Sequence, residues 1–218
     1  MNIKQKMILD QVKAGERLKV EEAEELLKAQ GADIYPILET AEEVKQEKVK
    51  DQITYVINYN LNLSNICINN CAFCGFNQRE NSSNTYTLTL EEINKHLKRI
   101  DKYDITEICL VSGLHPDFTL ATYVEVIKEI KVKLPQIHLH GITPAELEHA
   151  VRNQNIGFVE AYSRLKEAGL DSVPGTAAEI LIPEVRNEIC PNKISTRNWI
   201  KAIKAAHNVG LKSTATIL

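Results

Sequence analysis

The sequence lacks the features that mark secreted, membrane-spanning and nucleic-acid-binding proteins. Its five cysteines are odd in number and three stand together, which argues against a disulfide framework. No apolar run approaches the ~20 residues of a membrane helix, and a net charge of −3 gives no electrostatic attraction to nucleic acid or an anionic membrane surface. The first 18 residues contain no signal-peptide core. We therefore expect a protein of the reducing cytoplasm that binds neither nucleic acid nor membranes.

No internal repeat or low-complexity linker divides the chain. Its 218 residues are 44% hydrophobic and 25% charged, an ordinary composition for one sizeable core. Residues 1–50 carry apolar positions at helical spacing and are predicted to form a helical extension. Within residues 51–218, apolar runs rich in β-branched residues alternate with amphipathic stretches. This alternation predicts an α/β core of right-handed βαβ units around a parallel sheet.

Five strands are predicted for this sheet. They cover residues 53–65, 105–113, 137–142, 170–175 and 211–218. Ligands of such sheets bind at the carboxyl ends of the strands, so residues that follow the strands are the candidates for a site. The last strand closes the chain with an apolar run and no helix to cover it. We therefore expect a C-terminally truncated form of a longer enzyme; a complete five-stranded domain is the alternative.

Three cysteines, Cys67, Cys71 and Cys74, follow the first predicted strand in the run NICINNCAFCGF. A structural zinc ion needs four ligands, and a simple ferredoxin-type cluster needs four cysteines. Three thiolates around a four-iron cluster leave one iron open to S-adenosylmethionine (SAM), which the reduced cluster cleaves to a 5′-deoxyadenosyl radical. The spacing therefore predicts the metal ligands of a 4Fe-4S cluster, with SAM as the second cofactor.

Two other interpretations of these cysteines stay open. They could form a zinc knuckle with a remote histidine, or they could be ordinary buried thiols. Three thiols in one short loop are unfavourable as ordinary packing residues, but their spacing suits a set of metal ligands. Phe73, an aromatic residue just before the last cysteine, is usual in this spacing and is assigned to the cofactor site. Cys109 and Cys190 have apolar neighbours and are predicted to be small buried side chains.

Three stretches of the chain resemble a known family. They are NLNLSNICINNCAFCGF, LHGITPAELEHA, and AGLDSVPGTAAEIL with the residues that follow it. They are similar to the radical SAM enzymes that build the deazaflavin chromophore and to their menaquinone-pathway relatives. The segment PGTAAEIL distinguishes these groups and is similar to the second-subunit family of FO synthase. The resemblance begins at about residue 54, and it implies a partial (β/α) TIM-like radical SAM barrel.

The resemblance also implies a reaction. This family couples the 4-hydroxybenzyl group of L-tyrosine, released when the Cα–Cβ bond breaks, to 5-amino-6-(D-ribitylamino)uracil, a step towards the precursor of coenzyme F420. It implies an electron donor and FO synthase subunit 1 as partners in the pathway. The alternatives are a futalosine-pathway radical SAM enzyme, FO synthase subunit 1 itself, and a non-catalytic iron–sulfur or zinc protein.

The chain departs from the family pattern after the second strand. The family carries Gln-Gly-Gly before Leu-His-Pro, whereas this chain has Val111, Ser112 and Gly113 there. The resemblance implies that the backbone of this segment binds the amino group of SAM, so Ser112 and Gly113 are assigned to the cofactor. Glycine permits φ values that serine avoids.

Three strand residues are further candidates. Tyr59, on the first strand, either lines the SAM cavity or packs against a helix. His138 and His140 alternate on the third strand and therefore share a face. His140 matches a family position at the substrate end and is the predicted catalytic residue, for hydrogen bonding or proton transfer. His138 is interpreted as a strand histidine with a structural partner.

Charged residues complete the candidate site. Glu179 follows the fourth strand within an apolar run, and we predict that it binds the ribose hydroxyls of SAM. Arg186 and Lys193 could pair with a carboxylate of SAM or substrate, but both are expected on a solvated helix face.

Overall fold

The computed structural model describes residues 1–75 and 78–218. The chain divides into two compact units, Met1–Tyr55 and Val56–Leu218. Phe76, the last residue of the cysteine run quoted above, lies outside the described residues.

The first unit is helical. It contains α1 (Ile3–Lys13), α2 (Val20–Leu27), the 3₁₀ helix η1 (Gly31–Ile34) and α3 (Tyr35–Val49). Asn2 begins α1 through a reciprocal cap: its side chain accepts the Gln5 N–H at 2.8 Å, and the Gln5 side chain accepts the Asn2 N–H at 3.2 Å. Ile8, Leu9 and Leu26 form a small buried cluster between these helices. The unit thus has a core of its own.

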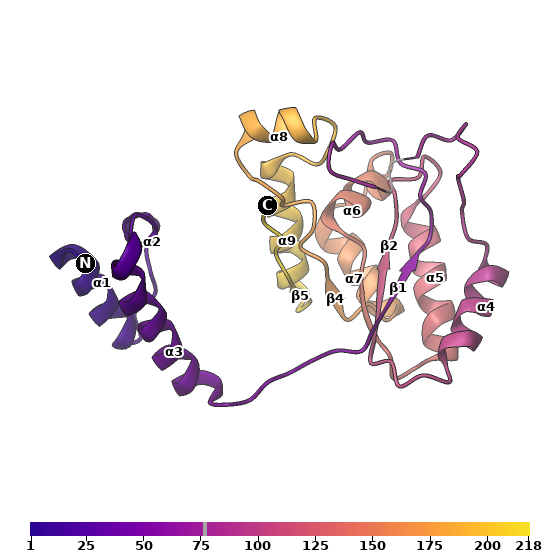
Figure 1. Ribbon diagram of the computed structural model, residues 1–218. Coiled ribbons are helices and arrows are strands. Elements are labelled where there is room, and N and C mark those ends of the chain that lie inside the picture. Colours follow the sequence, from indigo (N-terminus) through magenta and orange to yellow (C-terminus); the bar gives the residue numbers. More distant parts are fainter. Residues whose placement is uncertain (76–77) are drawn as a thin grey trace. The chain divides into compact units, whose positions relative to one another are not determined.

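The second unit is a parallel sheet with helices between its strands (Figure 1). The strands are β1 (Asn58–Asn62), β2 (Glu107–Val111), β3 (His138–Gly141), β4 (Ser172–Val173) and β5 (Lys212–Ser213). The helices are α4 (Leu90–Ile100), α5 (Leu120–Lys133), α6 (Pro144–Val151), α7 (Phe158–Ala168), α8 (Pro183–Ile189) and α9 (Thr196–Asn208). The strands pair in chain order, so β1 and β5 form the edges and the described sheet is open. The predicted α/β architecture with a partial barrel is confirmed.

The two faces of the sheet differ in polarity. Leu61, Leu110 and Leu139 point towards the helices and belong to one large apolar core. Asn62 and His140 have the opposite orientation along their strands and are only partly buried. The face that carries these polar residues is the one that would line the interior of a barrel.

The helices begin and end where local chemistry predicts. Thr89 caps α4, and Thr119 and Thr143 cap α5 and α6 in the same way. Gly169 ends α7 with a φ of 120°, a conformation that glycine adopts readily. In the described part of the chain, every helix is too short or too polar to cross a membrane.

Candidate functional site

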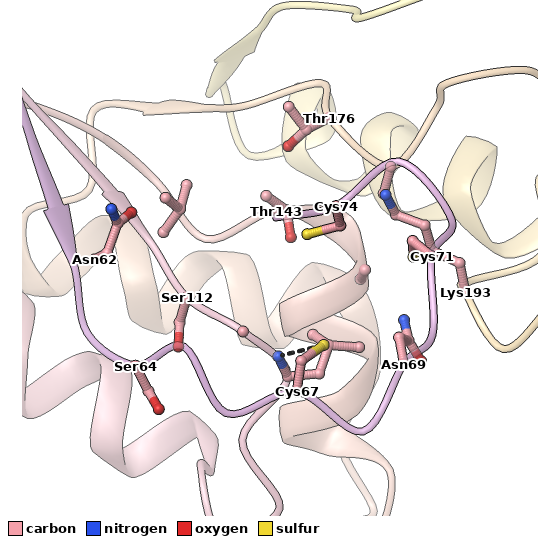
Figure 2. A pocket seen from close by; sticks show the side chains of 15 residues that line it. Asn62, Ser64, Cys67, Asn69, Cys71, Cys74, Ser112, Thr143, Thr176 and Lys193 are labelled. Carbon is pink, nitrogen blue, oxygen red and sulfur yellow. Dashed lines mark hydrogen bonds between the residues drawn. The ribbon is translucent and has the colours of Figure 1, made fainter. Parts of the chain in front are cut away.

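A cavity of about 220 Å³ lies at the carboxyl ends of the strands (Figure 2). Its walls come from the cysteine loop, the end of β2, the N-terminus of α6 and the segments beside α8. The lining residues are Asn62, Ser64, Cys67, Asn69, Cys71, Cys74, Val111, Ser112, Gly113, Leu114, Thr143, Ala145, Thr176, Ala177 and Lys193. The structure therefore brings the three predicted cysteine ligands together with Ser112 and Gly113.

Backbone hydrogen bonds hold the cysteine loop against the end of β2. The Gly113 N–H donates to the Ser64 carbonyl at 2.8 Å, and the Ile68 N–H donates to the Leu114 carbonyl at 3.0 Å. The Leu114 N–H donates to the Cys67 Sγ at 3.3 Å, the dashed line in Figure 2. The contact fixes the position of the Cys67 sulfur at the end of β2.

Gly113 is required here by close approach and not by its dihedral angles. A Cβ at this position would lie 2.2 Å from the Ile66 carbonyl oxygen and 3.2 Å from the Cys67 Cβ. Neither Gly113 nor Ser112 adopts a positive φ, so serine at position 112 costs nothing in backbone conformation. The glycine matters because the cysteine loop passes directly over it.

The opposite wall of the cavity is formed around α8. The Ala72 N–H donates to the Ile189 carbonyl at 2.8 Å. The Lys193 Nζ lies 5.1 Å from the centre of the Phe73 ring, a cation–π contact, and 2.6 Å from Oε1 of Glu179. Lys193 thus joins the cysteine loop to the segment that follows β4.

The electrostatics of the cavity suit a metal-bound thiolate. Burial raises the pKa of the Cys71 thiol to about 11, and the positive charge of Lys193 opposes this shift. A thiol with this pKa keeps its proton at neutral pH unless a metal replaces the proton. The donor set, with an amide on Cys67 and a cation beside Cys71, therefore fits a group that binds thiolates.

The three cysteines line one cavity (Figure 2). The ligands of a cluster bind separate irons, whereas a tetrahedral zinc ion needs its ligands around one point.

Three residues assigned to the cofactor, Tyr59, Phe73 and Glu179, lie outside the cavity lining. The Tyr59 hydroxyl lies 2.6 Å from Nδ1 of His96 on α4, so Tyr59 faces the helices, as in the packing alternative. Alternation along β1 explains this, because Asn62, at the opposite parity, lines the cavity. Phe73 is 43% exposed and stacks on Lys193. It contributes to the site through that lysine.

His140 also lies away from the cavity lining. Its Nδ1 is 2.7 Å from the Ser172 hydroxyl on β4, and Nε2 of His138 is 2.7 Å from the same oxygen. Burial lowers the pKa of His140, which favours the neutral ring. The two histidines share one face, as the alternation predicted, but the expectation that His140 opens onto the cysteine cavity is not met. A structural partner for His138 is present.

Glu179 reaches the cavity only through its partner. Its carboxylate accepts the Ala177 N–H at 3.1 Å and pairs with Lys193, and the residue is only 6% exposed. Its backbone has a φ of 48°, which is unusual for a residue other than glycine. Glu179 is not among the lining residues, and it is joined to the cavity through Lys193.

Arg186 contradicts the expectation of a solvated helix face. It is 3% exposed, and its guanidinium donates five hydrogen bonds to the carbonyls of Ala177, Ala178, Ile180 and Ile194. The short helix α8 gave no periodicity from which this burial could be inferred. Arg186 organises the segment that presents Ala177 and Lys193 to the cavity.

Replacing Arg186 with alanine should strongly destabilise the second unit. The change leaves buried carbonyl oxygens without donors, and we expect a loss of about 3 kcal/mol or more in the free energy of unfolding. Urea denaturation of this variant and of Arg164→Ala provides the test. Arg164 is exposed and pairs only with Glu160 on its own helix, so its loss should cost under about 0.5 kcal/mol. Equal effects of the two substitutions would contradict the role of Arg186.

The sequence analysis missed several residues that line the cavity. They are Asn62, Ser64, Asn69, Thr143 and Thr176. A signal existed for two of them, because Asn62 and Ser64 are the polar positions of an alternating strand whose apolar positions, Leu61 and Leu63, are buried. Thr143 directly follows the third strand, where ligands are expected. Lys193 was named as a possible partner of a carboxylate but expected on a solvated helix face, whereas its side chain is 13% exposed and lines the cavity.

Comparison with known proteins agrees with this site. Residues 61–218 match the family model described as Radical SAM superfamily. A curated relative from Methanospirillum hungatei, named 5-amino-6-(D-ribitylamino)uracil--L-tyrosine 4-hydroxyphenyl transferase, is 39% identical over 98% of this chain and 58% of its own length. A relative with the same name from Methanocaldococcus jannaschii is 41% identical over 85% of this chain and 52% of its own length. The chain thus spans between half and three-fifths of the length of these relatives.

A solved structure has the same fold. The crystal structure of HydG, a maturase of the [FeFe]-hydrogenase, superposes with a TM-score of 0.77 at 22% identity, over 99% of this chain and 46% of that one. At this identity the likeness concerns the fold alone.

Proposed function

The chain belongs to the radical SAM superfamily, and from this premise we propose that its cysteine cavity binds a 4Fe-4S cluster and SAM. Cys67, Cys71 and Cys74 would be the three protein ligands. The chemistry that such a loaded site supplies is reductive cleavage of SAM to a 5′-deoxyadenosyl radical. The observation that carries the proposal is that all three cysteines line one cavity at the carboxyl ends of the strands.

The protein's own groups are proposed to bind SAM, to orient it and to keep water away from the radical. The Leu114 N–H orients the Cys67 sulfur, and the backbone of Ser112 and Gly113 forms the wall proposed to receive the amino group of SAM. Lys193 supplies a positive charge at the rim for a carboxylate. Apolar lining residues such as Val111 keep water away from a reactive radical.

We propose further that the substrates are L-tyrosine and 5-amino-6-(D-ribitylamino)uracil, as named for the curated relatives. The coupling would join the 4-hydroxybenzyl group of tyrosine to the uracil, as in deazaflavin formation. His140 is proposed to hydrogen-bond or exchange a proton with substrate from the polar face of the sheet, and Glu179 to act near the SAM ribose. An electron donor, FO synthase subunit 1 and a cytoplasmic location complete the proposal.

Anaerobic reconstitution with iron and sulfide, followed by dithionite and SAM, tests the chemistry. We expect 5′-deoxyadenosine to form, and we expect the coupled product by mass spectrometry once both substrates are added. SAM cleavage without coupling would point to a futalosine-pathway enzyme or to the first FO synthase subunit. Bound zinc, or iron without SAM cleavage, would show a non-catalytic metal protein instead.

A further inference from the structure

A buried carboxyl group lies behind the cavity wall. Glu146, in the first turn of α6, is 1% exposed. Its Oε2 accepts the Thr143 N–H at 2.8 Å, and the Thr143 hydroxyl accepts the Glu146 N–H at 3.2 Å. This is a capping box, and its threonine lines the cavity.

The same motif occurs on the surface of the protein. At α4, Thr89 and Glu92 make the equivalent pair, in which Oε2 of Glu92 accepts the Thr89 N–H at 2.8 Å, but both residues are exposed. A capping box therefore works without burial. Placing Glu146 in an apolar interior carries a desolvation cost that capping alone does not explain.

The second carboxyl oxygen of Glu146 lies in the same buried environment. Oε1 is buried and has no hydrogen-bond partner in the described part of the chain; the same holds for the hydroxyls of Tyr123 and Tyr162. The carboxyl faces the backbone N–H of Ser112 and the Tyr123 hydroxyl, both of which lower its pKa. Glu146 thus lies at the N-terminus of α6, close to the end of β2.

The neighbouring backbone is strained and needs such support. Ile142, just before the cap, is fully buried and has a φ of 56°, a region that β-branched residues rarely adopt. Its N–H donates to the Leu110 carbonyl at 3.1 Å, next to the Ser112 segment. The turn from β3 into α6 is therefore held in one conformation by contacts to β2.

We propose that Glu146 is a positioning residue for SAM: its hydrogen bond to the Thr143 N–H fixes the start of α6 as the cavity wall beside the segment Ser112–Leu114, while the cysteine loop fixes that segment from the front. The front contacts are those of Gly113 with Ser64 and of Leu114 with Cys67. The role rests on the proposed binding of SAM at this segment.

Hydrogen exchange of the protein without its cluster tests whether Glu146 helps to hold the segment Ser112–Leu114 in place. In Glu146→Ala, the amides of Ser112–Leu114 should exchange at least tenfold faster than in the wild type, on the order of 1.4 kcal/mol of lost protection. The matched control is Glu92→Ala, which removes the same capping box from α4 and should leave these amides unchanged. Equal protection in all three proteins would overturn the proposal.

SAM binding tests the consequence. In the cluster-loaded protein, Glu146→Ala should weaken SAM binding about tenfold, as measured by equilibrium dialysis. The control Glu92→Ala should bind SAM as the wild type does. Glu146→Gln keeps an acceptor for the Thr143 N–H and should restore part of the affinity. If Glu146→Ala fails to fold, the Gln variant carries the test, and wild-type affinity and protection in it would overturn the proposed role of the Glu146 carboxyl. Wild-type protein that binds SAM but forms no coupled product would refute the proposed substrates and leave this inference intact.

The charge state of Glu146 gives an independent readout. Burial raises the pKa of Glu146 to about 7. The groups that face its carboxyl are Ser112, Tyr123, Thr143 and Tyr162. Cys109 is also near, because the Glu146 carboxylate adds to the rise that burial causes in the pKa of the Cys109 thiol. The folded protein then holds a proton that the unfolded chain has released. Stability should therefore fall as the pH rises from 4.5 through about 7. Glu146→Gln should remove this decline, and an unchanged decline would place the carboxyl outside the buried network.

Discussion

Removing any one of Cys67, Cys71 and Cys74 is expected to abolish both the visible absorbance of the reconstituted cluster and the cleavage of SAM. The cavity offers three thiols and no other side chain with a soft ligand atom, so the loss of one leaves the cluster without a replacement in the described lining. The expected effect is complete loss. Alanine variants, iron and sulfide analysis and anaerobic SAM assays measure it.

The two remaining cysteines are stringent controls for this result. Cys109 lies on β2, and Cys190 is buried close enough to Cys71 that their charges would interact. If a fourth thiolate completed a zinc site, Cys190→Ala would lose the metal. We expect both control variants to retain the cluster and its reactivity. A Cys71→Ala protein with an intact four-iron cluster and normal SAM cleavage would refute the assignment of the ligands.

Substituting Gly113 with alanine is expected to have the next largest effect. The added Cβ would lie 2.2 Å from the Ile66 carbonyl oxygen, a backbone atom that cannot rotate away. The cysteine loop must therefore move off the end of β2, which breaks the contact between Leu114 and the Cys67 sulfur. We expect a loss of at least about 2 kcal/mol in unfolding free energy and little or no cluster assembly, measured by urea denaturation and iron content.

Gly75, in the same loop, provides the matched control. A Cβ there would meet no atom within 4 Å, so Gly75→Ala should fold and bind iron as the wild type does. If Gly113→Ala also retained its cluster and its stability, the close approach between the loop and β2 would not be a requirement of the site.

The elements that the sequence predicted correctly are those with local signals. The alternation of apolar runs with amphipathic stretches predicted a parallel sheet of five strands with helices between them. The cysteine spacing predicted that three thiols would share one cavity, because all three lie in a single short loop after β1. Each of these inferences needs only neighbours in the chain.

The errors concern residues whose partners are distant in sequence. Nothing near Arg186 indicates that its guanidinium would reach carbonyls on both sides of α8. Glu179 was correctly singled out as a carboxylate in an apolar run, but its pairing with Lys193 depends on a contact 14 residues away. Tyr59 was assigned to the cofactor because its strand leads into the cysteine loop. Its position in the alternation along that strand, which turns it towards the helices, was not considered. Tertiary packing decided all three positions.

The arrangement around Arg186 has a consequence for one wall of the cavity. One side chain closes five hydrogen bonds at once, so the stretch between β4 and α9 cannot fray bond by bond. It is held or released as a cooperative unit. Ala177 and Lys193 lie at the two ends of that stretch, and Ile189 within it binds the cysteine loop. One wall of the cavity therefore depends on a single buried side chain for its conformation.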